Sequence, residues 1–401
     1  MPVTRRQFLQ LAGIGLASTV TVPPVFGSAP PVLIGLDAEF MDRTSTSDDA
    51  ILFGTQLAID DINARGGVLG GRPLQLVTTD NRGVPARGIH NVRYLAALPG
   101  MTAFLCGKFS PVVLDQVPEF HASHLPLLNP WAAADAIVDN RRSPNYAFRA
   151  GLRDSLAVGC LLDEIARHGL TDIGIMLPAT AWGRSCLFYA ERHLLLHPEN
   201  RLSIVATEWH RWGGDQQIGE QYLRHAASPA QAILLIANEP EGAALVKTIA
   251  EQPDGKRLPL FSHWGITGGR FPELCGPAFH HVELEVVQSF SFARAHGPQA
   301  RHVAQQAMNH FKVDDPLKVP SMTGIGPSYD LVQLLALAIE AAGTTDRLQI
   351  RAALEHLPAH DGLVRRYAPA FTPERHETLA AADVLLCSFD KDGRLVPKHR
   401  S

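Results

Sequence analysis

The sequence predicts an α/β protein of two domains, each built around a doubly wound parallel sheet. Its 401 residues exceed the roughly 100–200 residues that one domain usually contains. From Val32 onward, short aliphatic or β-branched runs alternate with longer segments of helical periodicity, which is the order of elements in α/β folds. Several of the short runs are continuously apolar, as is typical of parallel strands that helices cover on both faces.

The N-terminus predicts a signal peptide over residues 1–29 that directs export to the periplasm by the twin-arginine route. A pair of arginines, Arg5 and Arg6, precedes an uncharged stretch, Leu11–Val22, and small residues near Ala29. This is the pattern of a twin-arginine signal with its cleavage site. A membrane-anchoring helix is the alternative, but the uncharged stretch is shorter than the roughly 20 residues that span a bilayer.

Charge and cysteine usage restrict the function further. The formal charge of −4 becomes −6 without Arg5 and Arg6, and no basic run follows, so nucleic acid and anionic lipid are poor partners. The five cysteines are scattered and form no Cys-x-x-Cys pair, which favours neither a disulfide framework nor a zinc site, although one disulfide stays open. No histidine shows metal-ligand spacing. We therefore expect no metal and no cofactor.

The first predicted elements form a strand-helix-strand unit. Val32–Leu36 is a continuously apolar strand. The helix that follows carries an apolar stripe from Ile51 to Ile62, and Asp48 lies in its first turn, where the helix dipole favours negative charge. A Gly-Gly pair suits the left-handed end of this helix. The next strand is Leu74–Thr79.

The same strand-then-helix unit recurs three times, and further strands and helices follow it. The recurring units are Thr102–Cys106 with Pro111–His121, Asp172–Leu177 with Arg184–Leu196, and Ala232–Ala237 with Glu241–Gln252. The further strands are Leu258–Ser262 and Val282–Val287, and the long helices are Ala300–Phe311 and Tyr329–Ala342. Ligands of such sheets bind at the carboxyl ends of the strands. We therefore expect the binding site in the loops that follow these strands.

Seven segments of the chain share a further pattern. They are Gly54–Gly71 with Asp80 after its strand, Gly107–Ser110, Leu125–Pro130, Phe148–Ala150, Ala181–Arg184, Tyr329–Asp330 and Asp390–Arg394. In this order, and over nearly all of the chain after residue 30, they resemble the leucine/isoleucine/valine-binding protein family, the type I periplasmic solute-binding proteins of ABC importers. The order of the segments is more specific than any one of them.

The resemblance implies two Rossmann-like lobes joined by a hinge of three chain crossings. It assigns residues 30–148 and 290–362 to the first lobe, and residues 149–289 and 363–401 to the second. It also implies a monomer that closes on a small polar solute, such as a branched-chain amino acid, an amide or an aromatic acid, and delivers it to the permease subunits of an ABC transporter. Closure is then a population shift, because the solute bridges polar groups of both lobes.

The first lobe is expected to bind the solute through Ser110 and the loop Trp131-Ala132-Ala133. The resemblance gives Ser110 the role of holding a carboxylate, and a hydroxyl beside backbone N–H groups at a helix start suits an anion. Capping of its own helix is the alternative for Ser110. Family members commonly have a threonine in the loop, where Ala132 and Ala133 offer only backbone groups. Trp131 lines the cleft or packs in the core or hinge.

The second lobe is expected to contribute Trp182, Glu239, His263 and Trp264. The resemblance places a stacking aromatic residue at Trp182, and two tryptophans facing one cleft favour a ligand with a flat or apolar portion. It also places a carboxylate for an ammonium group in this lobe. Glu239 is the best substitute for that carboxylate, with a solvated loop acid as the alternative. His263 donates a hydrogen bond to the ligand or packs under Trp264.

An enzyme and a sensor subunit are the two alternative functions. The chain lacks the Gly-x-Ser-x-Gly, His-Glu-x-x-His and phosphate-loop motifs, so we do not expect an enzyme. A periplasmic sensor subunit that reports to a membrane receptor closes on its ligand by the same physics. The sequence leaves this alternative to transport open.

Overall fold

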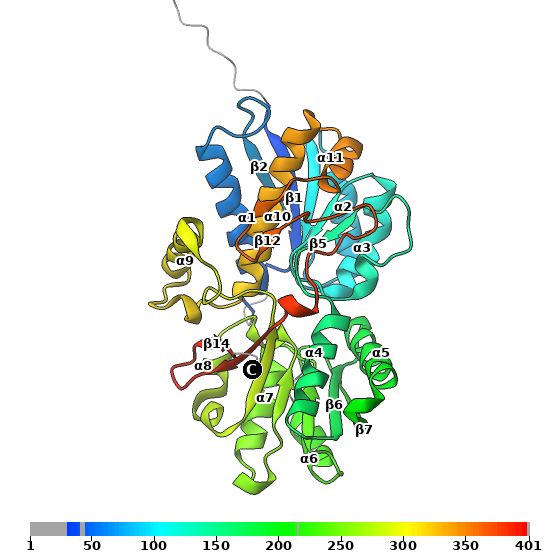
Figure 1. Ribbon diagram of the computed structural model, residues 1–401, viewed down its shortest axis with the longest axis vertical. Coiled ribbons are helices and arrows are strands. Elements are labelled where there is room, and N and C mark those ends of the chain that lie inside the picture. The colour runs from blue at the N-terminus through cyan, green and yellow to red at the C-terminus, as the bar shows by residue number, and fades with distance from the viewer. Residues whose placement is uncertain (1–29, 41–44, 215, 399–401) are drawn as a thin grey trace, which may run out of the picture.

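The chain folds into two α/β lobes, as the sequence predicts (Figure 1). The computed structural model describes residues 30–40, 45–214 and 216–398, so the expected signal peptide and its cleavage site lie outside the described residues. Every strand and helix that the sequence predicts is present, and the last long helix begins earlier than expected, at Met322.

The first lobe has a five-stranded parallel sheet in the order β2-β1-β3-β4-β5. Its strands are β1 (Val32–Ala38), β2 (Leu74–Asp80), β3 (Met101–Cys106), β4 (Leu127–Asn129) and β5 (Ala147–Arg149). Its helices are α1 (Ser47–Ala64), α2 (Pro85–Ala96), α3 (Ser110–Ala122), α9 (Gly297–Phe311), α10 (Met322–Ala342) and α11 (Arg347–Leu354). All residues of β3 are buried, because this central strand has helices on both faces.

The second lobe has a seven-stranded sheet in the order β14-β13-β10-β9-β8-β6-β7, in which β13 and β14 run antiparallel to their neighbours. Its strands are β6 (Asp172–Pro178), β7 (Ser203–His210), β8 (Ala232–Leu235), β9 (Leu260–Ser262), β10 (Leu284–Gln288), β13 (Leu385–Phe389) and β14 (Leu395–Pro397). Its helices are α4 (Asp154–Arg167), α5 (Ala181–Leu196), α6 (Ile218–Ala226), α7 (Glu239–Ala250) and α8 (Phe271–Cys275).

Helix α10 is the central helix of the first lobe. It is the one helix of the described chain long and apolar enough to cross a membrane, yet 94% of its most apolar stretch is buried inside the protein. It packs against α1 at Gly54, where an added Cβ would lie 2.6 Å from the carbonyl oxygen of Ile325. Only glycine therefore permits this close approach of the two helices.

The chain crosses between the lobes three times (Figure 1). The first crossing follows β5, the second follows β10, and the third lies between β12 (Arg366–Tyr367), which pairs with β11 (His360–Asp361), and β13. Residues 363–379 still contact the first lobe: the Leu363 N–H donates to Asp330 at 2.7 Å, and Glu377 pairs with Arg149. The expected boundary at residues 362/363 thus precedes the third crossing.

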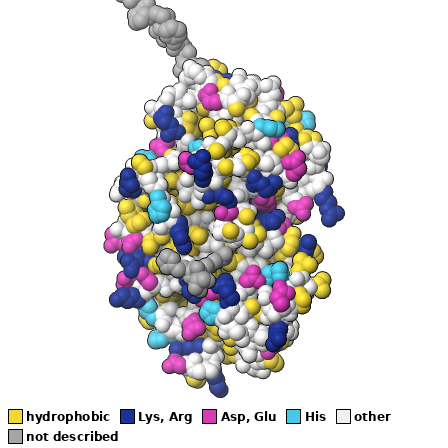
Figure 2. Space-filling model, viewed as in Figure 1, with side chains coloured by type: hydrophobic (Ala, Val, Ile, Leu, Met, Phe, Trp, Pro, Cys, Tyr) yellow, Lys and Arg dark blue, Asp and Glu magenta, His cyan; other side chains and the backbone are white. Residues whose placement is uncertain are grey.

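The surface carries both signs of charge. Figure 2 shows Lys and Arg interspersed with Asp and Glu on the face that it displays. A surface of mixed sign does not concentrate the electrostatic field that steers nucleic acid toward a protein.

Candidate functional site

The two lobes touch along the edge where the parallel strands of both sheets end. Ser45, in the loop after β1, donates a hydrogen bond from Oγ to Oε1 of Glu239 at 2.8 Å. The ring of Phe109, just before α3, meets the indole of Trp212 edge-on, with 4.1 Å between their centroids. Both contacts join one lobe to the other. The cleft between the lobes is therefore closed.

The closed cleft encloses a small cavity. Its volume is about 20 Å³, which is room for about one water molecule. The first lobe contributes Lys108, Ser110, Trp131 and Ala133 to its wall, and the second lobe contributes Trp182, Trp212, Asn238, His263, Trp264 and Gly265. A larger solute enters only when the lobes part and side chains of the wall shift.

Half of the ten residues in this wall carry an aromatic ring, and they include four of the five tryptophans of the chain. Trp182 meets Trp212 edge-on at 5.7 Å between centroids and meets His263 edge-on at 4.9 Å. His263 in turn stacks on Trp264 at 3.8 Å, with 26° between the ring planes. Such rings offer a large and rigid apolar surface that loses little entropy on binding. The wall therefore suits a ligand with a flat portion.

Hydrogen-bond donors gather around Ser110 at the first-lobe end of the cavity. The backbone N–H groups of Ala133 and Ala134 donate to Ser110 Oγ at 3.0 and 3.2 Å, so the hydroxyl contacts this loop rather than capping α3. Helix α3 begins at Ser110, and its dipole favours an anion there. Lys108 also lines the wall. The Ser110 oxygen accepts these two N–H groups, so its own hydrogen is left to donate. Hydroxyl and ammonium groups both bind carboxylates, so this end of the cavity suits an anion.

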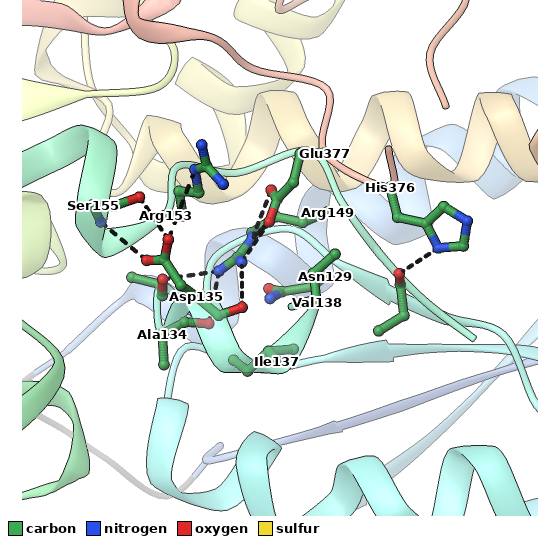
Figure 3. A network of polar contacts seen from close by, with 12 residues as sticks. Asn129, Ala134, Asp135, Ile137, Val138, Arg149, Arg153, Ser155, His376 and Glu377 are labelled. Carbon is green, nitrogen blue, oxygen red and sulfur yellow. Dashed lines mark hydrogen bonds and ion pairs between the residues drawn. The ribbon is translucent and has the colours of Figure 1, made fainter. Parts of the chain in front are cut away.

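Arg149 shapes the loop that carries these N–H groups (Figure 3). Its guanidinium is fully buried and donates to the carbonyl oxygens of residues 132–134 at 2.8 to 3.1 Å. It also pairs with Glu377 at 2.7 Å. Burial alone would lower the pKa of Arg149, but the Glu377 carboxylate outweighs this and the pKa is raised, so the guanidinium is charged. Because the carbonyls face Arg149, the N–H groups of the loop are left to face Ser110.

A buried carboxylate, Asp154, connects two rings of the second-lobe wall. Asp154 opens α4, and its Oδ1 accepts a hydrogen bond from Nε1 of Trp182 at 3.1 Å and lies 3.4 Å from Nε2 of His263. Burial lowers the pKa of His263, although Asp154 partly opposes this, so the imidazole is neutral at neutral pH. Asp154 does not line the cavity itself. It lies behind the rings and holds them.

Two groups of side chains have spacing that a metal ion could use. They are Asp154, Cys186 and His263, and Glu164, His168 and Glu285, each with ligand atoms within 4.8 Å of one another. Burial raises the pKa of the Cys186 thiol well above its usual value, which disfavours the thiolate that metals bind. In the second group Glu285 pairs with Lys398, and Glu164 pairs with Arg167. Both groups are therefore networks of hydrogen bonds and ion pairs.

A larger hollow, of about 470 Å³, lies beside the second crossing. Three cations line it, and two of them, Lys318 and Arg270, pair with a carboxylate three or four residues away. None of its lining residues has a buried polar side-chain atom without a hydrogen-bond partner among the described residues, whereas His263 and Trp264 of the tryptophan-lined cavity do. Such unsatisfied atoms indicate a binding role more directly than volume does, so we assign the site to the tryptophan-lined cavity.

Six of the eight predicted site residues lie in the wall of this one cavity. They are Ser110, Trp131, Ala133, Trp182, His263 and Trp264. Ala132 is not in the wall, because its carbonyl accepts hydrogen bonds from Asn129 and Arg149. Glu239 is not in the wall either, because it opens α7 and its carboxylate accepts the Ser45 hydroxyl. None of the ten residues in the wall is Asp or Glu.

Sequence reasoning missed Trp212, Asp154 and Arg149. Trp212 lies in the loop after β7, and the sequence pattern does not predict this strand. Asp154 has the position of an ordinary acid in the first turn of a helix. Arg149 was noted only as part of a family segment. The sequence does contain a signal for Arg149, which is a charged residue at the end of an apolar strand. A charged side chain in such a place is buried only when it has a partner.

Comparison with known proteins gives a family match and many fold matches. The periplasmic binding protein family matches residues 42–394. No curated protein sequence matches the chain. Among solved structures, a type 1 periplasmic binding protein from Bordetella pertussis superposes with a TM-score of 0.79 at 19% identity, covering 92% of this chain and 99% of that one.

Two further solved structures are transporter solute-binding proteins with bound ligands. A solute-binding protein from Rhodopseudomonas palustris in complex with 3,4-dihydroxybenzoic acid has a TM-score of 0.76 at 15% identity and covers 92% of this chain and 96% of that one. A branched-chain amino acid transporter substrate-binding protein from Streptococcus pneumoniae in complex with isoleucine has a TM-score of 0.74 at 18% identity and covers 92% and 100%. At these identities the likeness concerns the fold.

Proposed function

Because this chain belongs to the periplasmic binding protein family, we propose that it is the substrate-binding protein of an ABC uptake transporter and that its ligand is an aromatic carboxylate. The observation that supports this ligand class is the composition of the wall: four tryptophans beside a cluster of donors at Ser110. The rings bind the flat face of an aromatic acid. The Ser110 hydroxyl, whose oxygen already accepts the two N–H groups, donates its hydrogen to the carboxylate, and the positive charge of Lys108 favours the anion.

An amino acid fits this wall less well. Its α-ammonium group needs a carboxylate or several acceptors, because a buried unpaired charge is costly. The wall holds no Asp or Glu, and Glu239, the acid expected to fill this role, bonds to Ser45 instead. Asp154 lies behind the rings, where its Oδ1 accepts the Trp182 N–H, and it does not line the cavity. The aromatic acid is therefore the better ligand of the two classes found in the fold neighbours.

Isothermal titration of the purified mature protein with benzoate and with isoleucine tests the ligand class. We expect benzoate or a substituted benzoate to bind at least tenfold more tightly than isoleucine. The Trp182→Ala variant is expected to weaken that binding more than tenfold, about 1.4 kcal/mol. Trp209→Ala is the matched control, because Trp209 is 38% exposed and outside the cavity. Tighter binding of isoleucine, or equal losses in the two variants, would overturn the proposal.

Transport and export are tested in cells. Uptake of the labelled ligand is expected to fall in a strain lacking this chain and to return with the wild-type chain but not with Trp182→Ala. Unchanged uptake would favour the sensor role over transport. Replacing Arg5 and Arg6 with lysine is expected to remove the protein from the periplasmic fraction, because the twin-arginine signal is lost. An unchanged periplasmic yield would contradict this export route.

A further inference from the structure

The second-lobe end of the cavity contains two rings with unsatisfied polar atoms. Nδ1 of His263 and Nε1 of Trp264 have no hydrogen-bond partner among the described residues, and Nε2 of His263 has only Oδ1 of Asp154 near it, at 3.4 Å and without hydrogen-bond geometry. Both side chains line the cavity and are 1% exposed, so bulk water does not satisfy them. An unmade hydrogen bond of this kind costs roughly 1–3 kcal/mol for each buried group. A bound partner that contacts both atoms recovers that cost.

The two atoms differ in hydrogen-bonding character. Nε1 of Trp264 carries a hydrogen and acts only as a donor. For His263, the Asp154 carboxylate lies 3.4 Å from Nε2 and favours the tautomer that carries its hydrogen there, as a carboxylate beside a histidine does in many sites. Nδ1 of the neutral ring is then an acceptor. The stacked pair of rings, whose centroids are 3.8 Å apart, thus carries one donor and one acceptor.

A hydroxyl group is the smallest group that satisfies both atoms. Its hydrogen donates to Nδ1 of His263, and its oxygen accepts from Nε1 of Trp264. An ammonium group donates but cannot accept, and a carboxylate accepts but cannot donate, so each leaves one buried atom unsatisfied. A methyl group or a hydrogen atom leaves both unsatisfied. The pair therefore discriminates by hydrogen-bond pattern as well as by size.

We propose that His263 and Trp264, with Asp154 positioning the imidazole, form a subsite that recognises a hydroxyl group on the ring of the ligand, so that the preferred ligand is a hydroxylated aromatic acid. This inference rests on the proposed function and narrows it. The carboxylate binds Ser110 in the first lobe, and the hydroxyl binds the second lobe. One ligand then bridges both lobes through its two polar ends, which stabilises the closed form.

A panel of ligands of equal ring size tests the subsite on the full mature chain. Titration compares benzoate, the three methylbenzoates and the three hydroxybenzoates. We expect at least one hydroxybenzoate to bind tenfold or more tightly than both benzoate and the methyl compound with the same substitution pattern. Equal affinities across the panel would overturn the subsite and leave the aromatic acid proposal standing. Preference for isoleucine over every aromatic acid would overturn the proposed function itself.

Variants of His263 and Trp264 test whether these two rings cause the preference for a hydroxybenzoate. His263→Phe and Trp264→Phe each keep an aromatic ring and remove one polar partner. Each is expected to reduce the ratio of hydroxybenzoate to benzoate affinity at least fivefold, because the group that is removed contacts only the hydroxylated ligand. Trp209→Phe, outside the cavity, is the control for the loss of an indole and is expected to leave the ratio unchanged. If His263→Phe fails to fold, Trp264→Phe decides alone, and an unchanged ratio in a folded variant overturns the proposal.

Asp154→Asn tests the positioning role separately. The amide keeps the shape of the side chain but removes the charge that selects the imidazole tautomer. The affinity ratio is therefore expected to fall while benzoate affinity and the unfolding midpoint change little. An unchanged ratio would remove Asp154 from the subsite and leave it as a structural partner of Trp182.

Discussion

Replacing Arg149 with methionine is expected to destabilise the fold and the ligand-binding loop together. The guanidinium is 0% exposed, donates to three successive carbonyls of residues 132–134 and pairs with Glu377 (Figure 3). Methionine fills a similar volume but offers none of these donors. Each carbonyl loses one of its two donors, because Asn129, Asp154 and Ile137 still donate to them, and the carboxylate of Glu377, whose side chain is 14% exposed, is left without its cation.

The size of the effect follows from this burial. Removing one partner of a buried ion pair costs about 3–5 kcal/mol. The partial exposure of Glu377 lets water screen the remaining charge, so we expect Arg149→Met to lower the free energy of unfolding by about 3 kcal/mol, at the lower end of that range. The double variant Arg149→Met/Glu377→Met removes the uncompensated charge. It is expected to be more stable than Arg149→Met, and still less stable than wild type because the hydrogen bonds from the guanidinium to the three carbonyls are not restored.

Urea denaturation followed by circular dichroism measures these differences. Arg93→Met is the matched control: Arg93 forms a bidentate pair with Glu119 but its side chain is 65% exposed, so its loss is expected to be undetectable. Ligand affinity is expected to fall in both Arg149 variants, since the N–H groups of Ala133 and Ala134 lose their orientation. A loss below about 1 kcal/mol for Arg149→Met, or a double variant no more stable than the single one, would refute the reasoning.

Three more predictions concern the anion site, a buried acid and the thiols. Ser110→Ala is expected to weaken an aromatic acid about tenfold and to leave binding of a neutral analogue, such as benzamide, less affected; equal losses by titration would argue against a carboxylate at this end. Burial raises the pKa of Asp330 from 3.8 to about 6, so the folded state holds this proton more tightly than the unfolded state. This protonation contributes at most about 3 kcal/mol to the free energy of unfolding. The contribution is present in full below pH 4 and is lost as the pH rises through 6. Asp330→Asn should therefore remove this part of the pH dependence of the unfolding free energy, measured by urea denaturation at a series of pH values. The five cysteines form no disulfide; alkylation without reductant is expected to modify Cys160 first, because the other four are buried, and all five after unfolding, whereas a protected pair would contradict the structure.

Continuous apolar runs predicted the strands well where those strands are buried on both faces. The predicted strand Asp172–Leu177 is β6, which ends one residue later at Pro178. The criterion failed at β7 (Ser203–His210), where side chains are mostly half-exposed or exposed because the strand lies at the edge of the sheet. The sequence of β7 therefore lacks the continuous apolar run of a strand that is covered on both faces. Missing this strand also hid Trp212, since only the loops after identified strands were considered.

The rule that ligands bind at the carboxyl ends of parallel strands located the cleft. It could not identify the hydrogen-bond partner of each side chain there. Glu239 follows β8 at the expected edge, yet its carboxylate accepts a hydroxyl from Ser45, a residue of the other lobe and 194 positions away in the sequence. Arg149 and Glu377 lie 228 positions apart. Local periodicity contains no information about such pairs. Their effect on the site, removing an acid from the wall and orienting the N–H groups of a loop, follows only from the folded chain.

The position of the site relative to the crossings determines which of its contacts persist when the cleft opens. The first and third crossing segments run side by side where the Arg149 N–H donates to the His376 carbonyl at 2.8 Å and the Thr378 N–H donates to the Arg149 carbonyl at 3.0 Å. Bending is therefore confined to the residues just beyond this paired stretch.

Asp154 follows the first crossing by only a few residues, and its N–H donates to the Ala133 carbonyl at 2.9 Å. A contact this close to the hinge moves little during rotation, so it persists in the open form. The contacts of Ser45 with Glu239 and of Phe109 with Trp212 join the lobes without such a tether and must break. The rim thus opens while the hinge side of the wall stays assembled, and a ligand meets a partly preformed site, which reduces the entropy cost of binding.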